Sequence, residues 1–211
     1  MLDETTVKLR QTLGILGILL PILNLFFGLT FCAGYNPAGS LTSISATYYS
    51  GQSIIFTGLM FGVGLFFLCY KGYDIKDRIC SILTGIAAFV LVLFPCDLPG
   101  ATNRNFLMLP MEVTKYFHYI GALVFFLSLA YIILFQFTKT SEINLNRKSR
   151  KWKRNILYRV CGIIMLAGLI LGFTARLWSQ WPYWVFTGET IALWNFGIAW
   201  LCKGDLILKD L

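Results

Sequence analysis

Long runs of apolar residues dominate this sequence and constrain its fold more than any other feature. Six runs rich in Leu, Ile, Phe, Val and Gly are bounded by charged or turn residues, at about 11–33, 53–70, 79–96, 116–137, 158–175 and 183–202. A helix needs roughly 20 apolar residues to cross a bilayer, and the runs lack the period-two alternation of membrane strands. The pattern predicts an all-α polytopic membrane protein, with one six-helix transmembrane domain over residues 1–211.

The composition excludes several other classes of protein. Of the 211 residues, 57% are hydrophobic and 13% are charged, whereas a soluble domain has about 45–50% apolar and about 25% charged residues. So little polar surface cannot cover a water-soluble globule. The sequence therefore excludes a soluble enzyme, a disordered chain and a nucleic-acid-binding domain, in spite of the net charge of +8.

The basic residues are divided unequally between the two sides of the predicted bundle. Of the 18 Lys and Arg residues, 15 are assigned to the side of the two termini, and the other three are Arg104, Lys115 and Arg176. The positive-inside rule then places both termini in the cytoplasm and predicts a multi-pass protein of the bacterial inner membrane. Seven acidic residues lie on the cytoplasmic side and three on the outer side, so the net positive charge falls entirely on the cytoplasmic side.

One cytoplasmic connection, residues 139–158, contains a dense basic run. Lys and Arg next to a membrane each gain about 1 kcal/mol near an acidic leaflet. The run is interpreted as a topology anchor, with an anionic-lipid or protein partner as the alternative. A nucleic-acid partner is not expected, because no nucleic-acid-binding fold or motif accompanies the basic run. The run consists of Arg147, Lys148, Arg150, Lys151, Lys153 and Arg154.

Small residues and cysteines raise two further questions of packing. Gly58 and Gly62, and likewise Gly168 and Gly172, have the spacing that lets two helices approach closely. We expect both pairs to pack within the bundle, with a homo-oligomer interface as the alternative. At the outer helix ends, Cys32 and Cys96 are either joined by a disulfide or present as two free thiols; both alternatives remain open.

Ionisable residues in or near the membrane are the main candidates for a functional site, because they are costly in hydrocarbon. Asp97, His118 and Glu189 are all expected in the outer half of the bundle. A buried carboxylate and a histidine can exchange a proton or bind a ligand, although a polar network that only fixes the helices is the alternative. Asp, Glu and His are also ligands for divalent metals, so a metal site is a further alternative, although none is predicted here; the cofactor is left unknown. Further hydrogen-bonding candidates for the same pocket are Ser45, Tyr48, Tyr49, Arg104 and Arg176.

Short patterns connect the chain to a known group of membrane proteins. The patterns are Tyr35-Asn36-Pro37 after the first run, Phe94-Pro95-Cys96-Asp97 at the end of the third and His118-Tyr119-Ile120-Gly121-Ala122 in the fourth. Together they resemble an uncharacterised bacterial six-span integral membrane family, a domain of unknown function distantly similar to Frag/DRAM/Sfk-type membrane proteins. The resemblance implies the topology and a polar outer cluster, and it implies no reaction.

Three functions are compatible with these features. The first is a polar pocket facing the outer leaflet that binds a lipid or another amphiphile. The second is a small channel or proton-coupled carrier in which Glu189 and His118 titrate. The third is a non-catalytic assembly subunit with a basic cytoplasmic docking loop. A metal-dependent membrane hydrolase is a minor alternative, because a single histidine leaves such a centre short of ligands.

Overall fold

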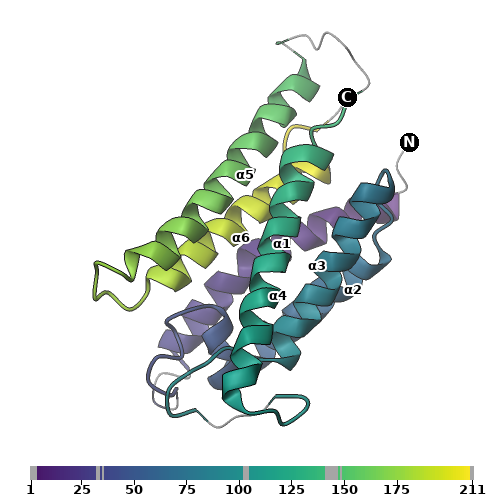
Figure 1. Cartoon of the computed structure of the whole chain (residues 1–211). Helices are drawn as coiled ribbons and strands as arrows, with labels where there is room; N and C mark the ends of the chain where they lie inside the picture. The colour runs from purple at the N-terminus through teal and green to yellow at the C-terminus, as the bar shows by residue number, and fades with distance from the viewer. Residues whose placement is uncertain are drawn as a thin grey trace.

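The regular structure of the chain is helical. The computed structural model describes residues 4–31, 34, 36–101, 105–140, 147 and 149–209, and within these ranges it contains no strand. This confirms the all-α prediction (Figure 1). The elements are α1 (Glu4–Leu29), the 3₁₀-helix η1 (Ser45–Tyr49), α2 (Ser53–Cys69), α3 (Ile75–Leu93), α4 (Met111–Tyr131), the π-helical continuation η2 (Ile132–Gln136), α5 (Arg150–Ala175) and α6 (Trp184–Lys203).

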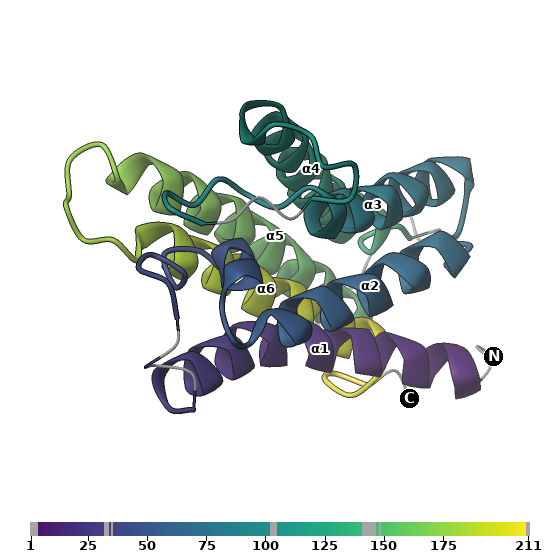
Figure 2. The same cartoon turned by 90° about the horizontal axis from the view of Figure 1, so that it is seen from below.

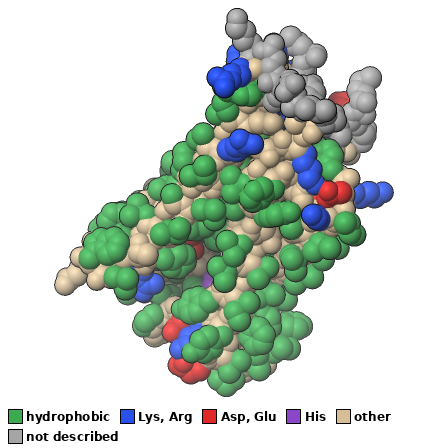
Figure 3. Space-filling model, turned by 45° about the horizontal axis from the view of Figure 1, so that its top comes forward, with side chains coloured by type: hydrophobic (Ala, Val, Ile, Leu, Met, Phe, Trp, Pro, Cys, Tyr) green, Lys and Arg blue, Asp and Glu red, His purple; other side chains and the backbone are tan. Residues whose placement is uncertain are grey.

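Three of the helical segments are long and apolar enough to cross a membrane. They are α1, α4 together with η2, and α5, and each has 26 residues. The apolar helix α2 is shorter, at 17 residues. Large apolar side chains also cover much of the outer surface (Figure 3), and Ile54, Leu123 and Ile170 are each at least 60% exposed. Soluble proteins rarely expose apolar surface over so large an area, whereas a bilayer covers it.

The helices surround the core in the order α5, α6, α1, α2, α3, α4, so the seam between α4 and α5 closes the ring (Figure 2). Helix α4 itself contacts α5 in few places, and the seam is packed mainly where η2 contacts α5. There, the Leu134 side chain fills the space that a side chain at Gly162 would need, so η2 packs directly against α5. Towards the opposite end α4 and α5 diverge (Figures 1 and 2), and the functional-site candidates lie at this end.

The two ends of the bundle differ in charge. One end, called the basic end here, holds the start of α1, the α2–α3 connection, the start of α5 and the end of α6. Lys8, Arg78, Lys139 and Lys203 lie there. The other end, called the pocket end, holds η1, the α3–α4 connection and the α5–α6 connection. The helix topology thus separates the basic residues as the sequence predicts.

The predicted boundary of the fifth helix is wrong by eight residues. Instead of beginning near residue 158, α5 begins at Arg150, and the Ser149 side chain caps it by accepting a hydrogen bond from the Trp152 N–H at 3.1 Å. The second half of the basic run is therefore helical rather than part of a loop. Within it, the Arg154 side chain is buried and donates to Asp205 at 2.7 Å.

The prediction for the two glycine pairs is right for one and wrong for the other. A Cβ added at Gly172 would lie 2.8 Å from the Trp184 carbonyl oxygen, and one at Gly168 would lie 2.7 Å from the Ile191 side chain, so α5 and α6 pack through this pair. Gly58 and Gly62 have no neighbouring atom within 4 Å of a Cβ position and face outwards on α2. Spacing alone does not specify which face of a helix meets the bundle.

Aromatic side chains fill the core towards the basic end. Trp200 of α6 is fully buried, and its ring lies 5.0–5.5 Å from those of Phe67, Tyr70 and Phe137 in edge-to-face contacts. This packing joins α2, α6 and the residue after η2 into one unit. The core at this end is therefore solid, in contrast to the pocket end.

Candidate functional site

A pocket of about 450 Å³ lies at the pocket end, between α4, α5, α6 and the segments that precede η1 and follow α3. Figure 3 shows the surface hollowed there, with the purple of the chain's one histidine visible in the hollow. Its wall is partly apolar, with Ala122 from α4, Phe173 from α5 and Val185 from α6. The volume falls within the range of about 300–1,000 Å³ that is usual for small-molecule sites.

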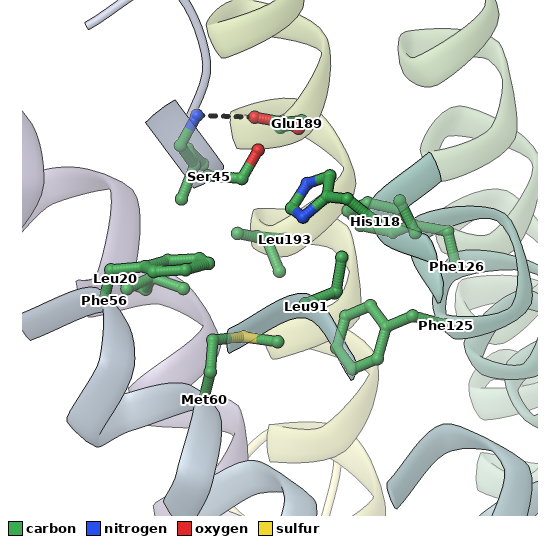
Figure 4. A pocket seen from close by; sticks show the side chains of 12 residues that line it. Leu20, Ser45, Phe56, Met60, Leu91, His118, Phe125, Phe126, Glu189 and Leu193 are labelled. Carbon is green, nitrogen blue, oxygen red and sulfur yellow. Dashed lines mark hydrogen bonds between the residues drawn. The ribbon is translucent and has the colours of Figure 1, made fainter. Parts of the chain in front are cut away.

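Glu189 lies at the floor of this pocket on α6, and its residue surface is only 8% exposed. Its Oε2 atom accepts a hydrogen bond from the Ile44 N–H at 2.6 Å, drawn as a dashed line in Figure 4. One turn earlier, the Phe186 N–H donates to the Thr42 carbonyl oxygen at 3.0 Å. These two contacts fasten the segment before η1 to α6 and bring Ser45 to the pocket.

His118 of α4 approaches the same floor from the opposite wall and is 3% exposed. Its Nδ1 atom lies 2.9 Å from the Phe94 carbonyl oxygen. Since a carbonyl oxygen only accepts, Nδ1 carries the proton in this contact, and in the neutral ring Nε2 is then an acceptor. The contact ties the end of α3 to α4 and fixes the orientation of the imidazole (Figure 4).

A second, smaller pocket of about 30 Å³ continues inwards from this floor. Ser45, His118, Ala122 and Glu189 line both pockets, so they form the boundary between them. Figure 4 shows the lining of the inner pocket, whose walls beyond the boundary are almost entirely apolar. These walls are formed by Leu20, Ile44, Phe56, Met60, Leu91, Phe125, Phe126 and Leu193.

The mouth of the outer pocket carries opposite charges. Arg176 follows α5 directly, and Asp97 follows α3 in the α3–α4 connection; both are exposed. Trp181 lies beside them in the α5–α6 connection and is 47% exposed. The pocket thus changes from a charged mouth to a floor with one buried carboxylate.

Five of the eight predicted site residues line the pocket: Ser45, Asp97, His118, Arg176 and Glu189. Asp97, His118 and Glu189 share it, but no hydrogen bond joins these three among the described residues. Arg104 lies outside the described residues, as does Cys32, which was considered for a disulfide with Cys96.

The two predicted tyrosines do not line either pocket. The Tyr49 hydroxyl donates to the Cys96 carbonyl oxygen at 2.8 Å, which fixes η1 to the end of α3. Burial, followed by the nearby Cys96, raises the pKa of Tyr49 above its usual range, so the hydroxyl keeps its proton and donates. Tyr48 packs with its ring edge-on to Tyr49 and contacts the core. Both residues support the segment that carries Ser45.

Several lining residues were not predicted from the sequence, among them Thr42, Tyr119 and Phe173. Phe173 precedes Arg176 by three residues, and this spacing places the two on one face of a helix. That signal was present in the sequence. The contribution of Thr42 depends on how its loop folds onto α6, and hydrophobic periodicity carries no information about loop conformation.

The described residues contain no group of three or more His, Cys, Asp or Glu side chains able to hold a metal ion. Comparison with known proteins adds no further assignment: no family model, no curated protein and no solved structure matches the chain. The resemblance to the six-span family with a domain of unknown function therefore depends on the short sequence patterns alone and stays a prediction.

Proposed function

We propose that this protein is a multi-pass protein of the bacterial inner membrane whose outer pocket binds a lipid or another amphiphile. The observation that carries the proposal is the pocket of about 450 Å³, with a charged mouth, a polar floor and a partly apolar wall. An amphiphile needs this combination, because its head group requires hydrogen bonds while its chains require apolar surface.

The proposed placement has six membrane crossings and both termini in the cytoplasm. The three long apolar helices support embedding, and the separation of basic residues supports the orientation under the positive-inside rule. The basic end then faces the cytoplasm, and the pocket end lies in the outer leaflet. In this placement, α2, α3 and α6 cross the bilayer together with the three longer segments.

The position of the pocket favours a ligand that enters from the membrane. The pocket is lined by Tyr119 and Ala122 of α4 and by Phe173 of α5, the two helices that diverge at this end (Figures 1 and 2). Tyr119 and Phe173 are each about half exposed, at 51% and 48%. The seam therefore opens towards the side of the bundle, where lipid chains lie in the proposed placement.

The basic run supports a more limited role than docking by the whole segment. Arg154 is buried against Asp205 and Tyr158, so it stabilises the bundle. Arg147, Arg150 and Lys153 are exposed, and we propose that they contact anionic lipids or a protein partner at the cytoplasmic surface.

An Ala122→Trp substitution is expected to remove ligand binding. Ala122 lines both pockets, and an indole there fills the space beside His118. The full chain is purified in mild detergent, and native mass spectrometry measures the fraction that retains one co-purified lipid. We expect this fraction to fall about tenfold.

The matched control is Leu127→Trp, which adds an indole to an exposed position of the same helix, 51% accessible. It is expected to retain lipid like the wild type. Val185→Trp, which fills the pocket from α6, repeats the test if Ala122→Trp does not fold. Wild-type protein without a retained lipid, or equal retention in pocket and control variants, would contradict the proposal.

A further inference from the structure

The floor of the outer pocket contains a carboxylate without a cationic partner. Only 8% of the Glu189 surface is exposed, and among the described residues no Lys or Arg forms an ion pair with it. Its hydrogen-bond donor in the described chain is the Ile44 N–H. Burial of a charged group is costly unless it is paired, and in a membrane protein such a group indicates a functional partner.

The groups around this carboxylate accept hydrogen bonds rather than supply positive charge. His118 donates through Nδ1 to Phe94, which leaves Nε2 as an acceptor in the neutral ring. Ser45 contributes a hydroxyl oxygen that lies 3.2 Å from the Ser43 hydroxyl oxygen. Glu189, His118 and Ser45 come from three different elements and meet at one floor (Figure 4). Such a floor is complementary to a ligand group with a positive charge and several N–H donors.

The mouth of the pocket, in contrast, offers a positively charged side chain to a negatively charged ligand group. Arg176 is the one Lys or Arg among the described lining residues, and Asp97 is the acidic residue on the mouth. An arginine side chain is permanently charged and binds phosphate oxygens through two parallel N–H donors. A ligand that extends from mouth to floor therefore meets a phosphate-binding group first and a carboxylate second.

We propose that the pocket recognises a phosphate head group bearing a primary ammonium, as in phosphatidylethanolamine, with the ammonium at Glu189 and the phosphate at Arg176. This inference rests on the proposed amphiphile binding and specifies its ligand. The source is a membrane lipid rather than the free head group, because the pocket wall at the α4–α5 seam is apolar. A quaternary ammonium does not fit the floor, since it has no N–H to donate to His118, Ser45 and Glu189.

The experiment compares lipids with identical acyl chains on the delipidated full chain in detergent, with native mass spectrometry as the readout. We expect phosphatidylethanolamine to bind at least about tenfold more tightly than phosphatidylcholine or phosphatidylglycerol. Glu189→Gln keeps an oxygen that accepts from the Ile44 N–H, so the fold is retained. In this variant the preference is expected to disappear, and phosphatidylethanolamine and phosphatidylglycerol bind equally.

The control variant is Glu112→Gln, at an exposed carboxylate that pairs with Lys115 outside the pocket; it is expected to keep the preference. Soluble phosphoethanolamine is expected not to displace the lipid at equal concentration, and displacement would overturn the membrane source. Equal binding of the three lipids by the wild type would overturn the inference and leave the proposed function standing. No binding of any lipid would overturn both.

Discussion

Replacement of Gly188 by alanine is expected to lower the free energy of unfolding by about 3 kcal/mol, the upper part of the range for overpacking. A Cβ at this position would lie 2.5 Å from the Gly168 carbonyl oxygen and 2.9 Å from the Gly172 Cα atom. Both are backbone atoms, so the clash is relieved only if α5 and α6 separate. This pair of helices carries Arg176 and Glu189, so the pocket depends on the contact.

The measurement is thermal unfolding of the purified chain in detergent. For a chain of this size, about 3 kcal/mol lowers the midpoint by about 6–12 °C. Gly172→Ala, from the facing helix, is expected to act in the same direction because its Cβ would lie 2.8 Å from the Trp184 carbonyl oxygen. Gly58→Ala is the matched control, since its Cβ meets no atom within 4 Å. If Gly58→Ala destabilised as much as Gly188→Ala, the account of the α5–α6 contact would be wrong.

Replacement of Asp205 by asparagine is expected to destabilise the basic end by about 2 kcal/mol. The Arg154 side chain is only 6% exposed, and it donates to Asp205 at 2.7 Å and to the Tyr158 hydroxyl at 3.2 Å. Removal of one partner of a fully buried ion pair costs about 3–5 kcal/mol. We expect less here because the Asp205 side chain is 25% exposed, and solvent screens part of the charge.

Asparagine is chosen because the backbone of Asp205 has φ = 58°, a left-handed conformation that asparagine tolerates. The midpoint of thermal unfolding is expected to fall by about 4–8 °C. The double variant with Arg154→Met is expected to lose less stability than the two single variants together, because neither charge is then left alone. Glu4→Gln serves as control: it breaks an exposed pair with Lys8, and a change under about 0.5 kcal/mol is expected. Equal effects of Asp205→Asn and Glu4→Gln would contradict the structural role of Arg154.

Most of the helical architecture was predictable, because apolar runs interrupted by charges identify helices in any membrane-like chain. The start of α5 was not predicted correctly, because the boundary was placed where the apolar run begins. Lys and Arg are good helix formers, so the helix extends back through the basic residues. The cap at Ser149 is the local signal that could have corrected the boundary.

The candidate site was predictable to the extent that buried charge is rare. Glu189 and His118 were singled out because an apolar helix rarely contains an ionisable residue, and both lie at the floor of the pocket. Tyr49 was placed in the site by its neighbours in sequence, but its hydroxyl is directed to the Cys96 carbonyl oxygen. The conformation of the loop around η1 decides where the Tyr49 hydroxyl points, and hydrophobic periodicity carries no information about loop conformation.

We propose that a lipid head group occupies the space between Glu189, His118 and Arg176. The most direct test is an experimental density map of the full chain in a bilayer of phosphatidylethanolamine, with a bound antibody fragment to add mass. We expect density that enters between α4 and α5 and ends beside Glu189. A pocket closed by its own side chains, with α4 packed against α5 along its whole length, would contradict it.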